Sequence, residues 1–190
     1  MKQKGPLGIS PSGNRPGRDK GKEEEPMNDE GGAASRAFGL EEGEGNARWW
    51  GGGLATIKAT SKDTGGRYTL VEVLGAEGEE VSLHVHHRED EAFWILEGEL
   101  TFQVGDETIK ASPGSFLVGP KGIPHGFTVD SGPARALFLL SPAGFEEFIY
   151  ATSEPAKERT LPPPPEGPPS EAEMEQLVAV ARQYGIEFLV

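Results

Sequence analysis

Apolar residues in the middle of the chain fall in short runs that are separated by turn-forming residues. Between residues 54 and 140, runs of Val, Ile, Leu, Phe and Thr alternate with clusters of Gly, Pro, Asp and Ser. Many short strands with regular turn signals are typical of an all-β sandwich or barrel. The expected strands span residues 54–59, 68–74, 81–86, 92–97, 99–104, 107–111, 115–118, 125–129 and 134–140.

Two glycines mark the clearest turns between these strands. Gly98 stands between two glutamates, and Gly105 precedes Asp106. Glycine is favoured where a turn requires a positive φ, because it has no Cβ. We therefore expect one chain reversal at each glycine.

The C-terminal part of the chain predicts two helices and a stiff connector. Residues 144–150 can form a short helix, and the proline-rich residues 161–169 favour an extended connector. Ser170 and Glu173 form a capping box that opens a second helix, and Gly185 suits its end. The apolar face of this helix consists of Met174, Leu177, Val178, Ala181 and Tyr184. Such a stripe predicts a helix that packs on the barrel rather than a mobile lid.

The N-terminal segment, residues 1–46, differs from the rest in composition. It consists largely of Gly, Pro, Lys and Glu, and such a segment cannot bury enough apolar surface to offset its ordering entropy. We expect it to be a disordered tail, with Met27 as an alternative start of the protein. The sequence shows no internal repeat, so we expect one barrel over residues 47–150. Residues 151–190 then form the connector and the helix.

Charge and composition exclude several classes of protein. The formal net charge of −13 repels phosphate backbones, so we expect no nucleic-acid partner. The chain contains no cysteine, which excludes disulfide frameworks and thiolate metal sites. We find no apolar run that predicts a signal peptide or a membrane span, and we therefore expect a cytoplasmic protein without a membrane partner.

All four histidines of the chain lie between residues 84 and 125. His84 and His86 are two positions apart on an expected strand, so both imidazoles point to the same face. Glu91 opens the next strand, and His125 begins a later one. Three imidazoles and one carboxylate suit a divalent first-row metal and leave coordination positions open for water or substrate. The competing interpretation is a group of exposed turn histidines, to which His87 belongs in either case.

The spacing of these residues matches two family motifs. The first motif reads Gly78-x5-His84-x-His86-x4-Glu91-x6-Gly98. The second reads Gly114-x5-Pro120-x-Gly122-x2-His125. The chain therefore resembles the cupins, and the segments HVHHREDEAFWILEGELTFQVGD and PGSFLVGPKGIPHGFTV resemble the single-domain, quercetin 2,3-dioxygenase-like cupins of bacteria. One departure is Val129, where the second motif usually ends in Asn.

The resemblance implies a fold, a set of metal ligands and an oligomeric state. It implies a cupin barrel, which is a jelly roll or double-stranded β-helix, and it favours a homodimer. The implied metal ligands are His84, His86, Glu91 and His125. They would hold one divalent transition metal, namely Fe, Mn, Co, Ni, Cu or Zn. In the family's chemistry, Glu91 is also the catalytic base for a substrate hydroxyl.

Strand alternation predicts the walls of a substrate pocket. If Glu91 and His125 point inward, then Phe93, Ile95, Phe127 and Val129 do so too. These side chains are either the walls of an apolar pocket for a small molecule or ordinary residues of a barrel core.

The outward face of the same strands is apolar as well. It carries Leu83, Val85, Ala92, Trp94 and Leu96. An exposed apolar patch of that size is unusual on a monomer, so a second sheet or a second subunit should cover it.

Three functions agree with such a site. The first is a dioxygenase-like metalloenzyme that acts on a small aromatic, flavonol-like substrate with O₂. The alternatives are a metal-dependent enzyme that uses no O₂, such as an isomerase or decarboxylase, and a non-catalytic cupin that binds a small molecule. The fold alone does not distinguish them.

Overall fold

The computed structural model describes residues 37–165 and 167–189. Its strands are β1 (Asn46–Trp50), β2 (Gly53–Ala59), β3 (Thr69–Gly75), β4 (Glu80–His86), β5 (Asp90–Val104), β6 (Glu107–Ala111), β7 (Phe116–Gly119), β8 (His125–Ser141), β9 (Glu154–Pro155) and β10 (Ile186–Phe188). Its helices are α1 (Ser61–Thr64), α2 (Phe145–Thr152) and α3 (Glu171–Gln183). Residues 37–45 of the predicted tail contain no helix or strand, and Asn46 already belongs to β1. Residues 1–36, which include Met27, lie outside the described residues.

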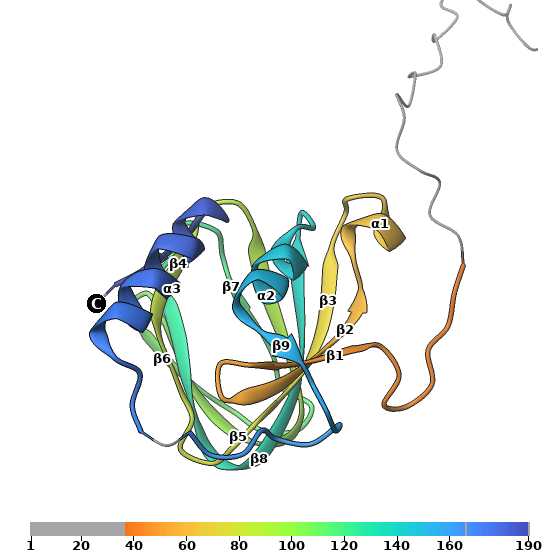
Figure 1. The fold of residues 1–190 in the computed structure, drawn as a ribbon. Coiled ribbons are helices and arrows are strands. Elements are labelled where there is room, and N and C mark those ends of the chain that lie inside the picture. Colours follow the sequence, from red (N-terminus) through yellow and green to blue (C-terminus); the bar gives the residue numbers. More distant parts are fainter. Residues whose placement is uncertain (1–36, 166, 190) are drawn as a thin grey trace, which may run out of the picture. The chain divides into compact units, whose positions relative to one another are not determined.

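The described strands curl around a common interior, as Figure 1 shows. They pair in the order β10-β4-β8-β3-β2-β1-β9, and β5 pairs with β6, β7 and β8. Each of these pairings is antiparallel. The predicted all-β barrel is therefore confirmed. Strand β8 is its centre, because it pairs with β3, β4 and β5.

Strands β5 and β8 are longer than the sequence predicts. Each was expected to be two strands, but each is a single strand with register shifts where it bends. Gly98 lies at the bend of β5 with φ +77, where an added Cβ would lie 2.7 Å from the Cα of Ala134. The prediction of a chain reversal at Gly98 is thus wrong, because the positive φ serves a bend inside one strand. Gly105 does lie in a hairpin turn, between the paired residues Val104 and Glu107.

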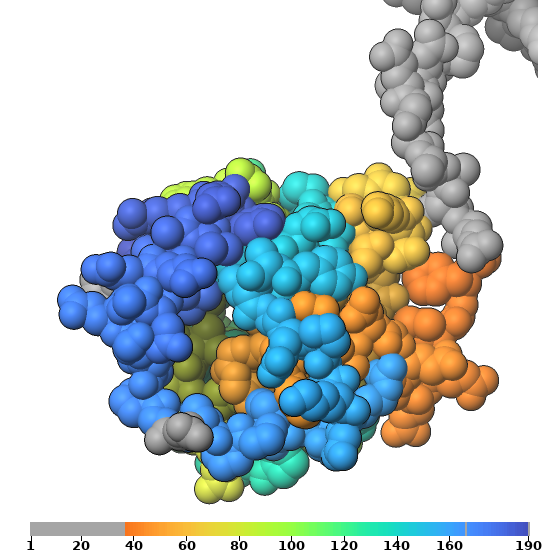
Figure 2. Space-filling model, viewed as in Figure 1, coloured from red at the N-terminus to blue at the C-terminus, as the bar shows by residue number. Residues whose placement is uncertain are grey.

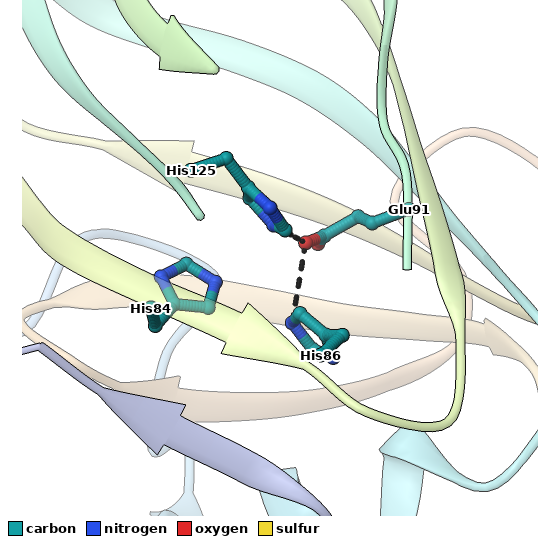
Figure 3. A group of neighbouring side chains, drawn as sticks. All are labelled: His84, His86, Glu91 and His125. Atoms are coloured by element: carbon teal, nitrogen blue, oxygen red, sulfur yellow. Dashed lines mark hydrogen bonds and ion pairs between the residues drawn. The ribbon is translucent and has the colours of Figure 1, made fainter. Parts of the chain in front are cut away.

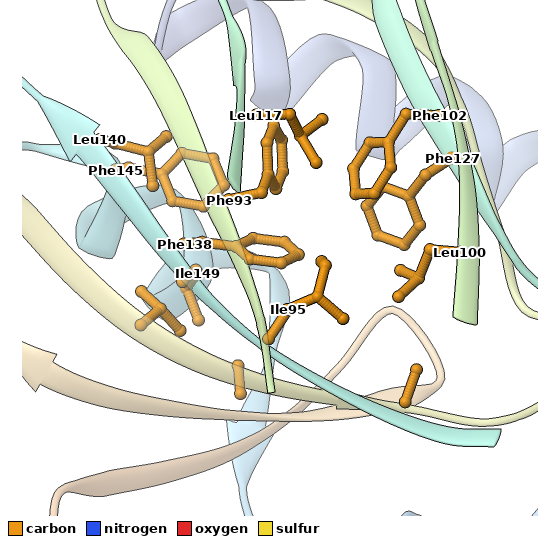
Figure 4. Close-up of a cluster of buried hydrophobic side chains, with 14 of the residues drawn as sticks. Phe93, Ile95, Leu100, Phe102, Leu117, Phe127, Phe138, Leu140, Phe145 and Ile149 are labelled. Atoms are coloured by element: carbon orange, nitrogen blue, oxygen red, sulfur yellow. The ribbon is translucent and has the colours of Figure 1, made fainter. Parts of the chain in front are cut away.

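The barrel interior is filled by aromatic side chains (Figure 4). The ring of Phe93 lies 4.9 Å from the rings of both Phe102 and Phe138. Phe102 in turn lies 5.2 Å from Phe127. All four side chains are buried, together with Ile95, so this end of the interior is packed with hydrocarbon rather than open to solvent.

The C-terminal segment packs on the barrel. The predicted capping box is present, since Ser170 accepts a hydrogen bond from the Glu173 amide and donates its own amide to the Glu173 carboxylate. Ala181 of α3 is buried, and Tyr184 after α3 lies 5.9 Å from Phe148 of α2. Strand β10, which the sequence did not predict, adds an edge strand to β4. Figure 2 shows the surface hollowed between α3 and the chain around β1 and β2.

An apolar surface lies on the outside of β5, β7 and β8. Trp94 is 51% exposed and Phe116 is 60% exposed, and their rings lie 6.2 Å apart. Val118 and Leu139 extend this surface, which we call the outer apolar face. Val85, which the sequence analysis grouped with it, is buried instead. Across the described residues, none of the helices has the length and apolar character needed to cross a bilayer.

Candidate metal centre

Two strands bring the three motif histidines together. His84 and His86 lie on β4 with their side chains buried, as the two-residue spacing predicts. His125 begins β8 and pairs directly with His84 across the sheet. The rings of His84 and His125 are 4.6 Å apart, and those of His86 and His125 are 5.5 Å apart. The antiparallel pairing of β4 with β8 therefore converts two distant sequence positions into one cluster.

Glu91 completes the cluster from a third strand, β5. Its Oε2 lies 3.1 Å from Nε2 of His125 and 3.4 Å from Nε2 of His86, as the dashed lines in Figure 3 mark. One ligand atom from each of the four residues lies within 4.8 Å of the others. The structure thus brings together the four residues that the motifs singled out. His87 instead lies on the outside, with Nε2 2.9 Å from the Glu187 carboxylate.

Each imidazole is held at its Nδ1 by an acceptor of the protein. Nδ1 of His84 lies 2.9 Å from the Ser82 carbonyl oxygen, and Nδ1 of His125 lies 3.0 Å from the Ile123 carbonyl oxygen. A carbonyl oxygen can only accept, so both Nδ1 atoms are donors. Nε2 is therefore the nitrogen that each of these rings directs at the cluster, and Nε2 of His125 lies against the Glu91 carboxylate.

Burial and charge set the protonation of the cluster. Burial lowers the pKa of His84 to about 4, so this imidazole is neutral. Burial alone would also lower the pKa of His86, but hydrogen bonds to Glu89 and Glu91 outweigh it and raise the pKa to about 9. Burial would raise the pKa of the Glu91 carboxyl, yet hydrogen bonds from His125 and His86 hold it well below its usual range. The centre therefore combines a buried carboxylate with imidazoles, a donor set that suits a divalent metal.

Aromatic rings surround the cluster on several sides. Phe145 of α2 lies 5.4 Å from His86, Phe188 of β10 lies 5.8 Å from His84, and Phe93 lies 6.2 Å from His125. Phe145 and Phe188 were not predicted to be near the site. No strand alternation could have identified them, because one lies on a helix and the other on a strand that contacts β4 only through tertiary pairing.

The four predicted pocket residues lie in the barrel core. Phe127 and Val129 line a cavity of about 10 Å³, which also borders Glu79 and Phe138. A cavity of this size holds about one water molecule. Phe93 and Ile95 are buried in the packed core but do not line this cavity. Their role as pocket walls stays a prediction.

Glu89 is the site residue that the sequence analysis missed. It falls between the expected strands 81–86 and 92–97, yet it is only 4% exposed and its Oε2 lies 3.4 Å from Nδ1 of His86. The connection contains Glu89, Asp90 and Glu91 in succession, and no periodicity in a loop distinguishes an inward carboxylate from an outward one. Asp90, by contrast, is exposed and accepts a hydrogen bond from the Lys121 amide.

Comparison with known proteins agrees with this geometry. The model of the cupin domain family matches residues 71–140, which contain most of β3, all of β4 to β7 and nearly all of β8. Both motifs and the whole four-residue cluster lie inside that match. The chain belongs to the cupin superfamily.

Other cupins resemble this one over larger parts of the chain. Quercetin 2,3-dioxygenase of Bacillus subtilis is 32% identical over 127 residues, which are 67% of this chain and 38% of that protein. The cupin thus spans well under half the length of this relative. The resemblance to the quercetin dioxygenase-like cupins is nevertheless confirmed at the level of sequence.

Solved structures support the fold. An RmlC-like cupin from Shewanella frigidimarina has a TM-score of 0.51 and 19% identity, and the match covers 60% of this chain and 98% of that one. A predicted oxalate decarboxylase from Thermotoga maritima has a TM-score of 0.50 and 16% identity, and the match covers 56% of this chain and 100% of that one. At such identities the likeness supports the cupin barrel and no particular reaction.

Proposed function

We propose that this cupin is a metal-dependent dioxygenase that acts on a small aromatic, flavonol-like substrate. The observation that supports this most is the buried cluster of His84, His86, Glu91 and His125, whose ligand atoms lie within 4.8 Å of one another. The name of the Bacillus subtilis relative suggests the substrate class, because quercetin is a flavonol. The aromatic rings around the cluster give such a substrate apolar surfaces to stack on.

The four side chains would hold one divalent ion of the first transition row. When bound, such an ion polarises an oxygen atom of the substrate and favours its reaction with O₂. The residues of the chain supply the remaining functions. The histidines direct their Nε2 atoms to one point, and the rings of Phe93, Phe145 and Phe188 lie beside them and exclude water. Glu91, which is ionised and buried, is placed to accept the proton of a substrate hydroxyl at its second oxygen.

Oxygen uptake tests this proposal. The protein would be stripped of metal, reloaded in turn with Fe(II), Mn(II), Co(II), Ni(II), Cu(II) or Zn(II), and given quercetin in an oxygen electrode cell. We expect uptake that depends on at least one metal and on quercetin. It should be lost in Glu91→Ala and kept in Glu99→Gln, which changes an exposed carboxylate of the same strand. Absence of uptake with every ion would reject the flavonol reaction and leave the non-oxidative and binding alternatives.

We also propose that a second copy of the chain covers the outer apolar face. Trp94 and Phe116 are both more than half exposed on neighbouring strands, and Val118 and Leu139 are 41% and 38% exposed beside them. A two-fold contact places the same surface on both partners, so this apolar face can pair with itself. Burial of two such aromatic side chains per subunit provides a strong apolar anchor.

Sedimentation equilibrium tests the homodimer. We expect a dimer for the wild type and a monomer for the double variant Trp94→Lys, Phe116→Lys, because four lysines would face one another across the two-fold axis. Leu83→Lys is the matched control, since Leu83 is 38% exposed on β4, which pairs with β8 and β10 and carries neither Trp94 nor Phe116. A monomeric wild type at micromolar concentration would contradict the proposal.

A further inference from the structure

The three histidines of the centre are oriented by two kinds of acceptor. His84 and His125 each face the main-chain carbonyl of the residue two positions earlier, at 2.9 and 3.0 Å. His86 instead faces a side-chain carboxylate, that of Glu89, which follows it by three residues. The distance from Nδ1 of His86 to Oε2 of Glu89 is 3.4 Å. His86 is therefore the one motif histidine whose Nδ1 faces another side chain.

The burial of Glu89 is unusual for its position in the chain. It lies in the connection from β4 to β5, where its neighbours Arg88 and Asp90 are exposed, yet Glu89 itself is 4% exposed. Burying a carboxylate is unfavourable unless a hydrogen-bonded partner compensates the loss of water. A loop has no packing reason to turn this side chain inward. The compensation comes from His86.

The connection that carries Glu89 is fixed at several points. The His87 amide donates to the Gly185 carbonyl at 2.8 Å, and the Gly122 amide donates to the His86 carbonyl at 2.9 Å. The Lys121 amide donates to the Asp90 carboxylate at 2.9 Å. The loop is thus held by the C-terminal segment on one side and by the turn before β8 on the other. Glu89 sits on a rigid support.

We propose that Glu89 is the positioning residue of His86. Its carboxylate accepts the Nδ1 proton of His86, which fixes the ring and makes Nε2 the nitrogen that faces the metal centre. This inference rests on the proposed function, because it presupposes that His86 is a metal ligand. A carboxylate on the far nitrogen of a ligand histidine also makes that histidine a stronger donor than a carbonyl does.

Metal affinity and histidine spectra test this role. Co(II) affinity would be measured by competition with a chromophoric chelator, for the wild type, Glu89→Ala and Glu89→Gln. We expect Glu89→Ala to bind Co(II) about 10–100-fold more weakly, as is typical when the hydrogen-bond partner of a ligand histidine is lost. Glu89→Gln should bind with intermediate affinity, because its amide oxygen still accepts the Nδ1 proton without the charge.

The second readout is nitrogen-15 NMR of the Zn(II)-loaded protein. In the wild type we expect Nδ1 of His86 to carry a proton, and we expect the chemical shift of that proton to lie strongly downfield. In Glu89→Gln the shift of the same proton should move upfield. The matched control is Glu187→Gln, which removes the carboxylate of the exposed His87–Glu187 pair. It should leave both the Co(II) affinity and the His86 signals unchanged.

The outcomes separate this inference from the function on which it rests. If the wild type binds no metal, the proposed metal centre fails first and Glu89 with it. If the wild type binds metal and Glu89→Gln keeps wild-type affinity and wild-type His86 shifts, the positioning role is overturned while the centre stands. Binding of Zn(II) through Nδ1 of His86 would overturn it as well. Because Glu89→Gln preserves the volume of the side chain, the test does not depend on whether Glu89→Ala folds.

Discussion

Replacing His84 by alanine is expected to weaken Co(II) binding by more than about 100-fold. Loss of the hydrogen-bond partner of a ligand alone weakens metal binding by about 10–100-fold, and this substitution removes a ligand itself. The substitution removes one of four donors from the cluster. The barrel should remain folded, because the imidazole of His84 is neutral and its Nδ1 contacts only the Ser82 carbonyl. Glu91 keeps both of its partners, His86 and His125. Titration with Co(II), followed by its visible absorption, measures the effect.

The natural control is His87→Ala, which removes an exposed imidazole next to the cluster. It should bind Co(II) like the wild type.

His86→Ala should also lose metal, but with a loss of stability, because Glu89 and Glu91 would both remain in the interior without this histidine. Retention of full metal occupancy by His84→Ala would show that the ligand assignment is wrong.

Replacing Glu146 by glutamine is expected to destabilise the barrel by about 3 kcal/mol at neutral pH, since unsatisfied buried groups cost about 1–3 kcal/mol each. Glu146 is 1% exposed at the start of α2. Its carboxylate accepts hydrogen bonds from the Ser61 amide at 2.7 Å, from the Gly144 amide at 3.0 Å and from the Thr69 hydroxyl. The NH2 group of a glutamine would face either the Ser61 amide at one oxygen position or the Gly144 amide and the Thr69 hydroxyl at the other, so at least one buried donor would lose its acceptor. Urea unfolding of both proteins measures the difference.

The contribution of Glu146 depends on pH in a defined direction. Burial alone would raise the pKa of its carboxyl, but the hydrogen bonds from Ser61 and Thr69 hold the pKa below its usual value. A carboxyl whose pKa is lowered by folding stabilises the protein fully above the unfolded pKa of about 4.3, and loses this contribution as the pH falls toward the folded pKa. The gap between wild type and Glu146→Gln should therefore narrow in acid.

Glu147→Gln is the control for this prediction, because Glu147 is the next residue of the same helix and is exposed. Its unfolding free energy should stay within about 0.5 kcal/mol of the wild type, as for most surface substitutions. A gap between wild type and Glu146→Gln that widens as the pH falls would contradict the assignment of Glu146 as an ionised, hydrogen-bonded carboxylate.

The parts of the site that the sequence predicts are those governed by short-range rules. The spacing of His84 and His86 places both on one face of a strand by the two-residue period alone. The motifs then direct attention to Glu91 and His125, which the structure places beside them. Ser170 and Glu173 likewise predict the start of α3, because a capping box is a local arrangement.

The missed features depend on tertiary contacts. Gly98 signals a positive φ, but only the close approach of Ala134 shows that the chain bends there instead of reversing. Strand β10 has three residues and no pattern of its own, and it exists because β4 offers a free edge. Glu89 belongs to the same class. Its inward orientation follows from a loop that is held by two hydrogen bonds to residues far away in the sequence. The His87 amide donates to the Gly185 carbonyl, and the Lys121 amide donates to the Asp90 carboxylate.

The pairing of β10 with β4 has a consequence for the order in which the protein folds. Ile186 pairs with His86 and Phe188 pairs with His84, and each pair closes a very long loop of chain. Closing a long loop costs conformational entropy before the contacts it allows can stabilise the chain. Local hairpins such as β5–β6 are therefore expected to form sooner than pairings between distant segments. The histidine strand is bordered by β8 and β10, both of which follow it in the chain. We therefore expect the metal centre to form after the local hairpins, because His84 and His86 meet His125 only when β4 pairs with the distant strand β8.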